Sequence, residues 1–149
     1  MVNIGLANID DFEQVALLFD QYRQFYAQKP DLIGSQKFIE QRLIAQDSVI
    51  LLAKNENKIG AGFIQLYPLF NSITCKRSLI LYDLFVSPDY RRQGIAQQLM
   101  NFAKDYALKT GVDRMELSTS KTNLSAQKLY ESLGWKIDPE FHYYVLELP

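Results

Sequence analysis

The stretch LFVSPDYRRQGIAQQLM, residues 84–100, joins an apolar strand to a helix through a turn with two arginines and one glycine. The helix is predicted to begin at about Gly94, and a helix N-terminus exposes about four unpaired N–H groups and a partial positive charge. Acidic side chains normally lie at this end, yet Arg91 and Arg92 lie here. A bound phosphate would remove the conflict, because Gly94 and Ala96 leave the backbone accessible. A solvated arginine pair beside a tight turn explains the turn equally well.

Two other phosphate-binding motifs are absent from this turn. A Walker loop requires G-x-x-x-x-G-K-[ST], and residues 84–100 have no such spacing. A dinucleotide-binding fingerprint requires G-x-G-x-x-G near the start of the fold, whereas this turn has one glycine and lies late in the chain. An anion bound here would therefore belong to another class of ligand.

Length and composition indicate one globular domain, residues 1–149. The chain is 48% hydrophobic and 22% charged, with 16 Lys+Arg against 17 Asp+Glu and a net charge of -1. This balance excludes the broad basic surface of a nucleic-acid-binding protein. The first residues, MVNIGLANIDD, lack a basic segment followed by an apolar run, and no stretch reaches the ~20 apolar residues of a membrane span. We therefore expect a cytoplasmic protein without a membrane partner.

The chain has one cysteine and one histidine, which limits its chemistry. Cys75 has no intramolecular disulfide partner, in agreement with a reducing compartment. A structural zinc site needs about four Cys or His ligands, and no clustered Asp/Glu spacing suggests another metal site. A serine-hydrolase triad would have to use His142, and no G-x-S-x-G precedes it. The sequence predicts no metal.

Apolar periodicity predicts a mixed α/β fold. We expect helices over 10–28, 35–46, 94–109 and 123–134, with Asp10 and Glu13 as a capping box and Ser35 and Asn123 as N-caps. The expected strands are 2–7, a hairpin over 48–67, 77–87, 113–119, WKI at 135–137 and FHYYVLEL at 141–148. Strand, helix and strand between 77 and 119 predict a parallel pair, so the sheet has about seven strands with about four helices on its faces.

Two segments together carry a resemblance to a known family. The stretch 84–100 resembles the acyl-CoA-binding motif of the GNAT superfamily of N-acetyltransferases, an Arg/Gln-x-x-Gly-x-Gly/Ala loop, with Ala96 in place of the second glycine. The stretch NLSAQKLYESLGWK, residues 123–136, resembles that family's second motif. The two motifs lie in the family's order and cover roughly residues 77–136. The resemblance implies a single-domain GNAT-like fold with a partly splayed sheet.

The resemblance assigns most of an acetyl-CoA site to the first motif. In the family, the loop's backbone amides hold the pyrophosphate, and pantetheine pairs with the preceding strand like an added strand. The residues so assigned are Leu84, Phe85, Val86, Arg91, Arg92, Gln93, Gly94, Ile95, Ala96 and Gln97. A backbone N–H near Leu84 would polarise the thioester carbonyl. Pantetheine pairing also requires the strand at 113–119 to splay away.

The second motif implies two further residues of the site. Asn123 matches an asparagine that contacts the cofactor, although a helix N-cap alone would explain it. Tyr130 matches the tyrosine that contacts the cofactor and protonates the departing thiolate. A phenol has a pKa of about 10 against about 8.5 for a thiol, so it can donate a proton without itself being ionised at pH 7. A core aromatic beside Leu129 and Leu133 is the alternative.

The general base is the least defined part of the site. Asp83 is a lone carboxylate in the apolar run LYDLFV, and burial without a partner is costly. It is therefore a candidate base, with a structural carboxylate as the equal alternative. Related enzymes often have Glu one position earlier, where this chain has Tyr82. Glu116, His142 and a chain of waters are the other candidates.

We therefore expect an acetyl-CoA-dependent N-acetyltransferase that acts by direct attack of an amine in a ternary complex. Acetyl-CoA is the cosubstrate, and no cysteine nucleophile is needed. The alternative is an idle acyl-CoA-binding or sensing module on the same fold. The candidate walls for the amine are the aromatic residues Tyr22, Phe25, Tyr26, Tyr67 and Phe70. The final strand at 141–148 is a candidate edge for a homodimer.

Overall fold

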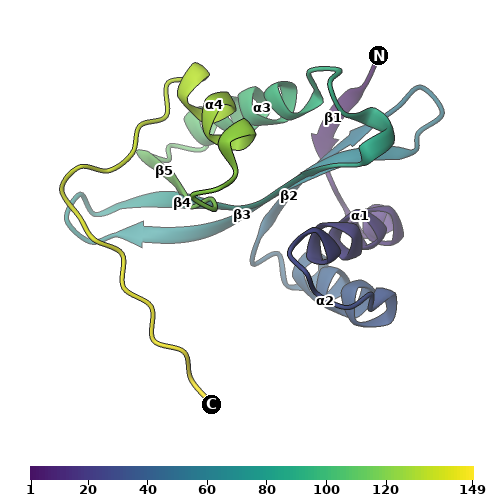
Figure 1. Ribbon diagram of the computed structural model, residues 1–149, viewed down its shortest axis with the longest axis horizontal. Coiled ribbons are helices and arrows are strands. Elements are labelled where there is room, and N and C mark those ends of the chain that lie inside the picture. The colour runs from purple at the N-terminus through teal and green to yellow at the C-terminus, as the bar shows by residue number, and fades with distance from the viewer. The chain divides into compact units, whose positions relative to one another are not determined.

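The computed structural model describes residues 1–149 as two units, Met1–Ser118 and Thr119–Pro149. The first unit contains the β-sheet and three α-helices, and the second contains one helix and the C-terminal segment (Figure 1). Each unit is described separately below. None of the helices is long and apolar enough to cross a membrane.

The first unit is built on a five-stranded sheet whose strands lie side by side in chain order. The strands are β1 (Asn3–Leu6), β2 (Val49–Lys54), β3 (Gly60–Asn71), β4 (Lys76–Val86) and β5 (Arg114–Leu117). The pairs β1–β2, β2–β3 and β3–β4 are antiparallel, whereas β4 and β5 are parallel. Both the expected hairpin and the expected parallel pair are confirmed.

Helices cover both faces of this sheet (Figure 1). Helices α1 (Phe12–Phe25) and α2 (Leu32–Ala45) lie on one face, and α3 (Ile95–Lys109) lies on the other. The first face is closed by an apolar cluster in which Val15, Leu18 and Ile39 pack against Phe63 and Phe85. Because side chains alternate along a strand, the neighbouring Ile64 points toward the face that α3 covers.

The caps of the first helices differ from the predicted ones. The Asn8 side chain accepts a hydrogen bond from the Asp10 N–H at 2.9 Å, and the Asp11 carboxylate accepts from the Asn8 N–H at 3.1 Å. This box precedes α1 by one 3₁₀ turn, so the expected pairing of Asp10 with Glu13 is wrong. Likewise Asp31, not Ser35, caps α2, which begins three residues earlier than predicted.

Ser35 is instead part of a buried joint between α1 and α2 around Asp20. The Asp20 carboxylate accepts hydrogen bonds from Arg23, Gln24, the Asp31 N–H and Ser35 at 2.9–3.2 Å. Burial opposes ionisation, but these donors outweigh it and lower the pKa of Asp20. The loop between the helices is thereby fixed by a charged group.

The second unit contains α4 (Leu124–Ser132) and no strand. The two strands predicted at 135–137 and 141–148 are therefore wrong, and the sheet has five strands instead of about seven. The Asp138 side chain accepts hydrogen bonds from the Glu140 and Phe141 N–H groups, which forms a local turn where the last strand should start. Apolar alternation shows that a segment can form a strand, but a strand also needs a neighbouring strand to pair with. Tyr143 and Tyr144 lie in the predicted last strand, and both remain about 90% exposed.

Candidate active site

The sheet opens beside the residues predicted to bind pantetheine. Pairing between β4 and β5 runs only from Ser78 to Leu81 on β4, while pairing with β3 continues to Val86. Leu84, Phe85 and Val86 therefore have a neighbouring strand on one side only. Pairing with β5 ends at Leu81, which leaves main-chain groups of β4 beyond it available to an extended ligand.

The arginine–glycine turn leads into α3 through two residues with positive φ. Arg92 has φ 59° and Gly94 has φ 73°. The first hydrogen bond of α3 runs from the Gln98 N–H to the Gly94 carbonyl at 3.0 Å, and no side chain caps the helix. The N–H groups of Ile95, Ala96 and Gln97 therefore precede the helical ladder, as an anion site requires. A Cβ on Gly94 would meet only the Gln98 amide at 4.0 Å, so the space above the turn is open.

The two arginines of this turn differ in their contacts. Arg91 donates from Nε to the Val86 carbonyl at 3.0 Å, and its guanidinium lies 5.5 Å from the centre of the Phe85 ring. Arg91 therefore ties the turn to the end of β4 and occupies one acceptor that the sequence assigns to pantetheine. Gln93 donates to the Asp89 carbonyl at 3.4 Å. Arg92 is exposed.

The candidate base lies next to an irregularity in β4. Gln65 pairs with Asp83 and Leu66 pairs with Leu81, so Tyr82 is an extra residue in β4. A bulge of this kind redirects the side chains and carbonyls around it. Here the Tyr82 carbonyl accepts a hydrogen bond from the Tyr22 hydroxyl at 3.3 Å. The bulge therefore links helix α1 to the strand that carries Asp83.

Asp83 is buried, with 3% of its surface exposed. Its Oδ2 accepts a hydrogen bond from the Gln65 amide nitrogen at 2.7 Å, and the Tyr22 hydroxyl lies close to its carboxyl. Burial raises the pKa of Asp83 above its ordinary value, and these two donors only partly offset the effect. A carboxyl with a raised pKa accepts a proton more readily than an exposed aspartate.

Tyrosines surround Asp83 on the α1 face. Burial raises the pKa of both Tyr22 and Tyr67, and the nearby Asp83 charge adds to the shift. The rings of Tyr67 and Tyr82 meet edge to face at 5.3 Å, and Tyr82 is largely exposed. Tyr22 and Tyr67 are thus candidate wall residues that lie close to the carboxylate. Phe70, the last aromatic of the predicted wall, is 82% exposed.

The remaining candidates lie on other segments of the chain and have contacts of their own. Glu116 pairs with Arg114 at 2.9 Å, and His142 and Cys75 are exposed. In the second unit, Asn123 caps α4 through a hydrogen bond from the Ala126 N–H at 3.2 Å, so the predicted cap is confirmed. Tyr130 lies on α4 with its ring 6.4 Å from that of Trp135. The structure holds no group of three His, Cys, Asp or Glu side chains arranged for a metal ion.

Sequence reasoning missed Gln65 and Ser48. Gln65 is fully buried in β3, and its amide oxygen accepts a hydrogen bond from the Ser48 hydroxyl at 3.0 Å. The available signal was a lone amide in the apolar run GAGFIQLY, since a buried polar group requires a partner. The identity of that partner depends on strand register.

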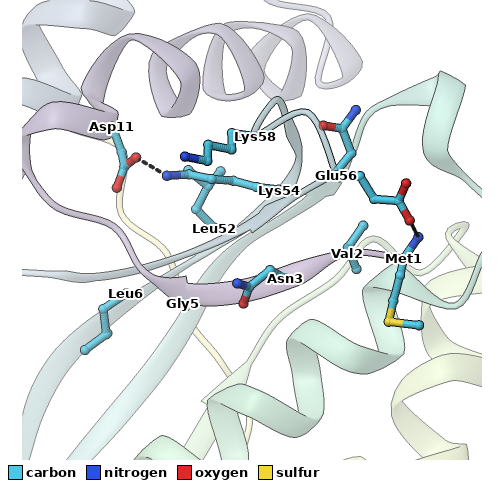
Figure 2. Close-up of a pocket in the computed structure, with 11 residues that line it drawn as sticks. Met1, Val2, Asn3, Gly5, Leu6, Asp11, Leu52, Lys54, Glu56 and Lys58 are labelled. Atoms are coloured by element: carbon cyan, nitrogen blue, oxygen red, sulfur yellow. Dashed lines mark hydrogen bonds and ion pairs between the residues drawn. The ribbon is translucent and has the colours of Figure 1, made fainter.

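The structure also has a cavity of about 690 Å³ along β1, the end of β2 and the turn that follows it. Figure 2 shows Lys54 directed at Asp11, with which it forms an ion pair, and the Met1 ammonium against Glu56 at 3.3 Å. None of the residues predicted to bind acetyl-CoA lines it. Lys54 and the Met1 ammonium, two of the cations that line this cavity, already have acidic partners. The cavity is therefore not the predicted acetyl-CoA site.

Comparison with known proteins decides the family. The sequence profile of the "Acetyltransferase (GNAT) family" matches residues 13–135. The chain is also 44% identical over 148 residues to the uncharacterized N-acetyltransferase YhfO of Bacillus subtilis, and the match covers 99% of both chains. The chain belongs to the GNAT family of acetyltransferases. Enzymes of this family use acetyl-CoA.

Solved structures agree with this assignment. The crystal structure of a probable acetyltransferase superposes with a TM-score of 0.94 at 41% identity, covering 99% of this chain and 98% of that one. An aminoglycoside N-acetyltransferase in complex with CoA superposes with a TM-score of 0.81 over 99% of this chain and 96% of that one. At 20% identity, the second likeness concerns the fold alone.

Proposed function

We propose that this GNAT acetyltransferase transfers an acetyl group from acetyl-CoA to a primary amine by direct attack in a ternary complex. The observation that carries the proposal is the uncapped N-terminus of α3 behind the open edge of β4. Unpaired N–H groups with an adjacent cation suit a pyrophosphate, and an unpaired strand edge suits an extended amide chain. The complex of a structural neighbour with CoA supports the same choice of ligand.

In this proposal, the main chain of Leu84–Val86 pairs with pantetheine, except for the Val86 carbonyl that Arg91 occupies, and residues 91–97 bind the pyrophosphate. Arg92 supplies the exposed charge, whereas Arg91 holds the turn against Val86. Asn123 contributes a polar contact in addition to its cap. Gly94 keeps the turn open to the phosphates because nothing in the protein fills the space above it.

The proposed chemistry needs one base and one acid. Asp83 takes a proton from the acceptor ammonium, and the neutral amine then attacks the thioester carbonyl. The C–S bond breaks as the new C–N bond forms, and Tyr130 donates a proton to the departing thiolate. The attacking nitrogen then loses its second proton, which restores the Tyr130 hydroxyl through solvent, and Asp83 releases its proton to solvent. Asp83 is suited to the first step because its burial favours proton uptake.

The decisive assay is CoA release from acetyl-CoA over a panel of lysine peptides, polyamines, amino acids and aminoglycosides. We expect turnover with at least one amine and none without an amine. CoA binding in the absence of any turnover would favour the sensing module.

The site itself is tested by Gly94→Glu. A carboxylate at the pyrophosphate position should weaken CoA binding by about a hundredfold or more, which corresponds to about 3 kcal/mol. Gly111→Glu is a matched control, because Gly111 has φ 72° and open space at the other end of α3. Calorimetric titration measures both variants. Equal CoA affinity in both would exclude the turn as the phosphate site.

The acid is tested by Tyr130→Phe, which removes the hydroxyl and keeps the ring beside Trp135. We expect kcat to fall by about a hundredfold while CoA affinity stays close to that of the wild type. Steady-state kinetics at saturating amine measure this change. Full turnover in a folded variant would remove Tyr130 from the mechanism.

A further inference from the structure

Gln65 lies between two polar side chains in an otherwise apolar part of β3. Its amide nitrogen donates to Asp83 Oδ2 at 2.7 Å, and its amide oxygen accepts from the Ser48 hydroxyl at 3.0 Å. Ser48 directly precedes β2, Gln65 lies on β3 and Asp83 lies on β4. The two hydrogen bonds therefore connect three neighbouring strands of the sheet. Gln65 itself is fully buried.

This arrangement satisfies an ionised Asp83. A carboxylate only accepts hydrogen bonds, and Gln65 presents a donor to it. A protonated carboxyl carries one O–H and keeps acceptor capacity on its other oxygen. Oδ2 can therefore still accept from Gln65 when the proton is on Oδ1.

The Ser48 hydroxyl fixes the orientation of the Gln65 amide. It donates to the amide oxygen, which leaves the amide nitrogen directed at Asp83. A hydrogen bond to an ionised carboxylate is stronger than one to a neutral carboxyl, so Gln65 favours ionised Asp83 while it holds both forms in place.

We propose that Gln65 is a positioning residue that hydrogen-bonds to Asp83 both before and after Asp83 takes the proton of the acceptor amine. The inference rests on the proposed role of Asp83 as the base. It assigns to Gln65 and Ser48 the task of holding the carboxyl in one place while its protonation changes. No atom of Gln65 has to touch the substrate.

The test compares the pH dependence of kcat in wild type, Gln65→Leu and Gln65→Glu. Loss of the donor in Gln65→Leu disfavours ionised Asp83, which moves the acidic limb of the profile to higher pH by about one unit. Gln65→Glu places two carboxyls together and should move the limb further in the same direction. We expect kcat to fall about tenfold in Gln65→Leu, with little change in KM for acetyl-CoA.

Other titratable and charged groups lie near Asp83 or near its tyrosine neighbours. These groups are Tyr22, Tyr67 and Tyr82 around the carboxyl, Tyr26 beside Tyr22, and Arg42 and Asp47 near Tyr67. All of them are unchanged in the Gln65 variants. Ile64→Val is the matched control for packing, because Ile64 is an equally buried neighbour on β3 whose side chain points to the opposite face. It should leave the pH profile unchanged.

A direct titration separates this inference from the proposed function. The carboxyl ¹³C shift of Asp83, assigned with Asp83→Asn, reports its protonation without any turnover. The inference is supported if Gln65→Leu shifts the acidic limb of the kcat profile and the midpoint of the Asp83 ¹³C titration by the same amount. An unchanged titration and limb in the folded variant overturn it.

Two remaining outcomes are also informative. If Asp83→Asn keeps full turnover, the base is wrong and the positioning role falls with it, even where the titration still responds to Gln65→Leu. If Gln65→Leu does not fold, Ser48→Ala takes its place. Removing the hydroxyl leaves one amide group of Gln65 unpaired, and we expect a smaller shift of the limb in the same direction as for Gln65→Leu. No shift in Ser48→Ala then overturns the proposal.

Discussion

Two buried carboxylates, Asp20 and Asp83, have opposite environments. Asp20 lies between α1 and α2 and accepts hydrogen bonds from Arg23, Gln24, Ser35 and a backbone N–H. Asp83 lies at the bulge of β4 with a neutral amide and a tyrosine hydroxyl as partners. Accordingly, the pKa of Asp20 is lowered and the pKa of Asp83 is raised.

This difference separates a carboxylate that stabilises the fold from a carboxylate that is a candidate for proton transfer. Asp20 gains more from its donors than it loses through burial, so its charge stabilises the fold. Asp83 keeps an unfavourable charge in the protein, and such a group is a candidate for proton transfer. Residue type and exposed surface do not distinguish the two positions; the number and charge of their donors and the extent of desolvation do.

The largest expected effect comes from Asp83→Asn on activity. An amide of the same shape cannot take up a proton, so kcat should fall by about 10²–10⁴-fold. CoA affinity should be unchanged, because Asp83 is not among the groups assigned to the coenzyme. Steady-state kinetics and calorimetric binding test both statements. If Asp83→Asn keeps the wild-type kcat, Asp83 is a structural carboxylate like Asp20, and the two residues do not differ in role.

The same substitution at Asp20 should act on stability. Asp20→Asn removes the charge from four hydrogen bonds and turns one acceptor into a donor, which should lower the free energy of unfolding by about 1.5–3 kcal/mol. Urea denaturation at pH 7 measures this loss. The kcat of the folded fraction should match that of the wild type, and a selective loss of kcat would contradict the structural role.

The smallest expected effect is a gain in stability for Asp83→Asn. Because the pKa of Asp83 is raised in the folded state, wild-type folding binds extra protons, and its stability falls as the pH rises from the ordinary aspartate pKa toward the folded one. The amide avoids this loss, so the thermal midpoint at pH 7 should rise by a few degrees.

The gain should disappear at acidic pH, where the wild-type carboxyl is protonated in both the folded and the unfolded state. Thermal unfolding of both proteins over a range of pH therefore tests the sign. A variant that is less stable than the wild type at pH 7 would show that the Asp83 charge stabilises the fold, as that of Asp20 does.

The sequence predicted most elements of the fold and their order. Apolar periodicity identified every helix, although the predicted caps of α1 and α2 were wrong and α2 begins at Leu32 with Asp31 as its cap. Apolar runs identified the five strands of the sheet. The same pattern wrongly added strands after Gly134, because strand propensity does not specify whether a neighbouring strand is available.

The sequence by itself determined the turn at Arg91–Ala96. Its signals are local: a strand, a positive-φ glycine and a helix start lie within a few residues, and main-chain N–H groups carry the proposed binding. Only the tertiary structure decided the environments of Asp20 and Asp83. Their donors come from residues 3 to 61 positions away, and a carboxylate's protonation depends on those donors and on desolvation.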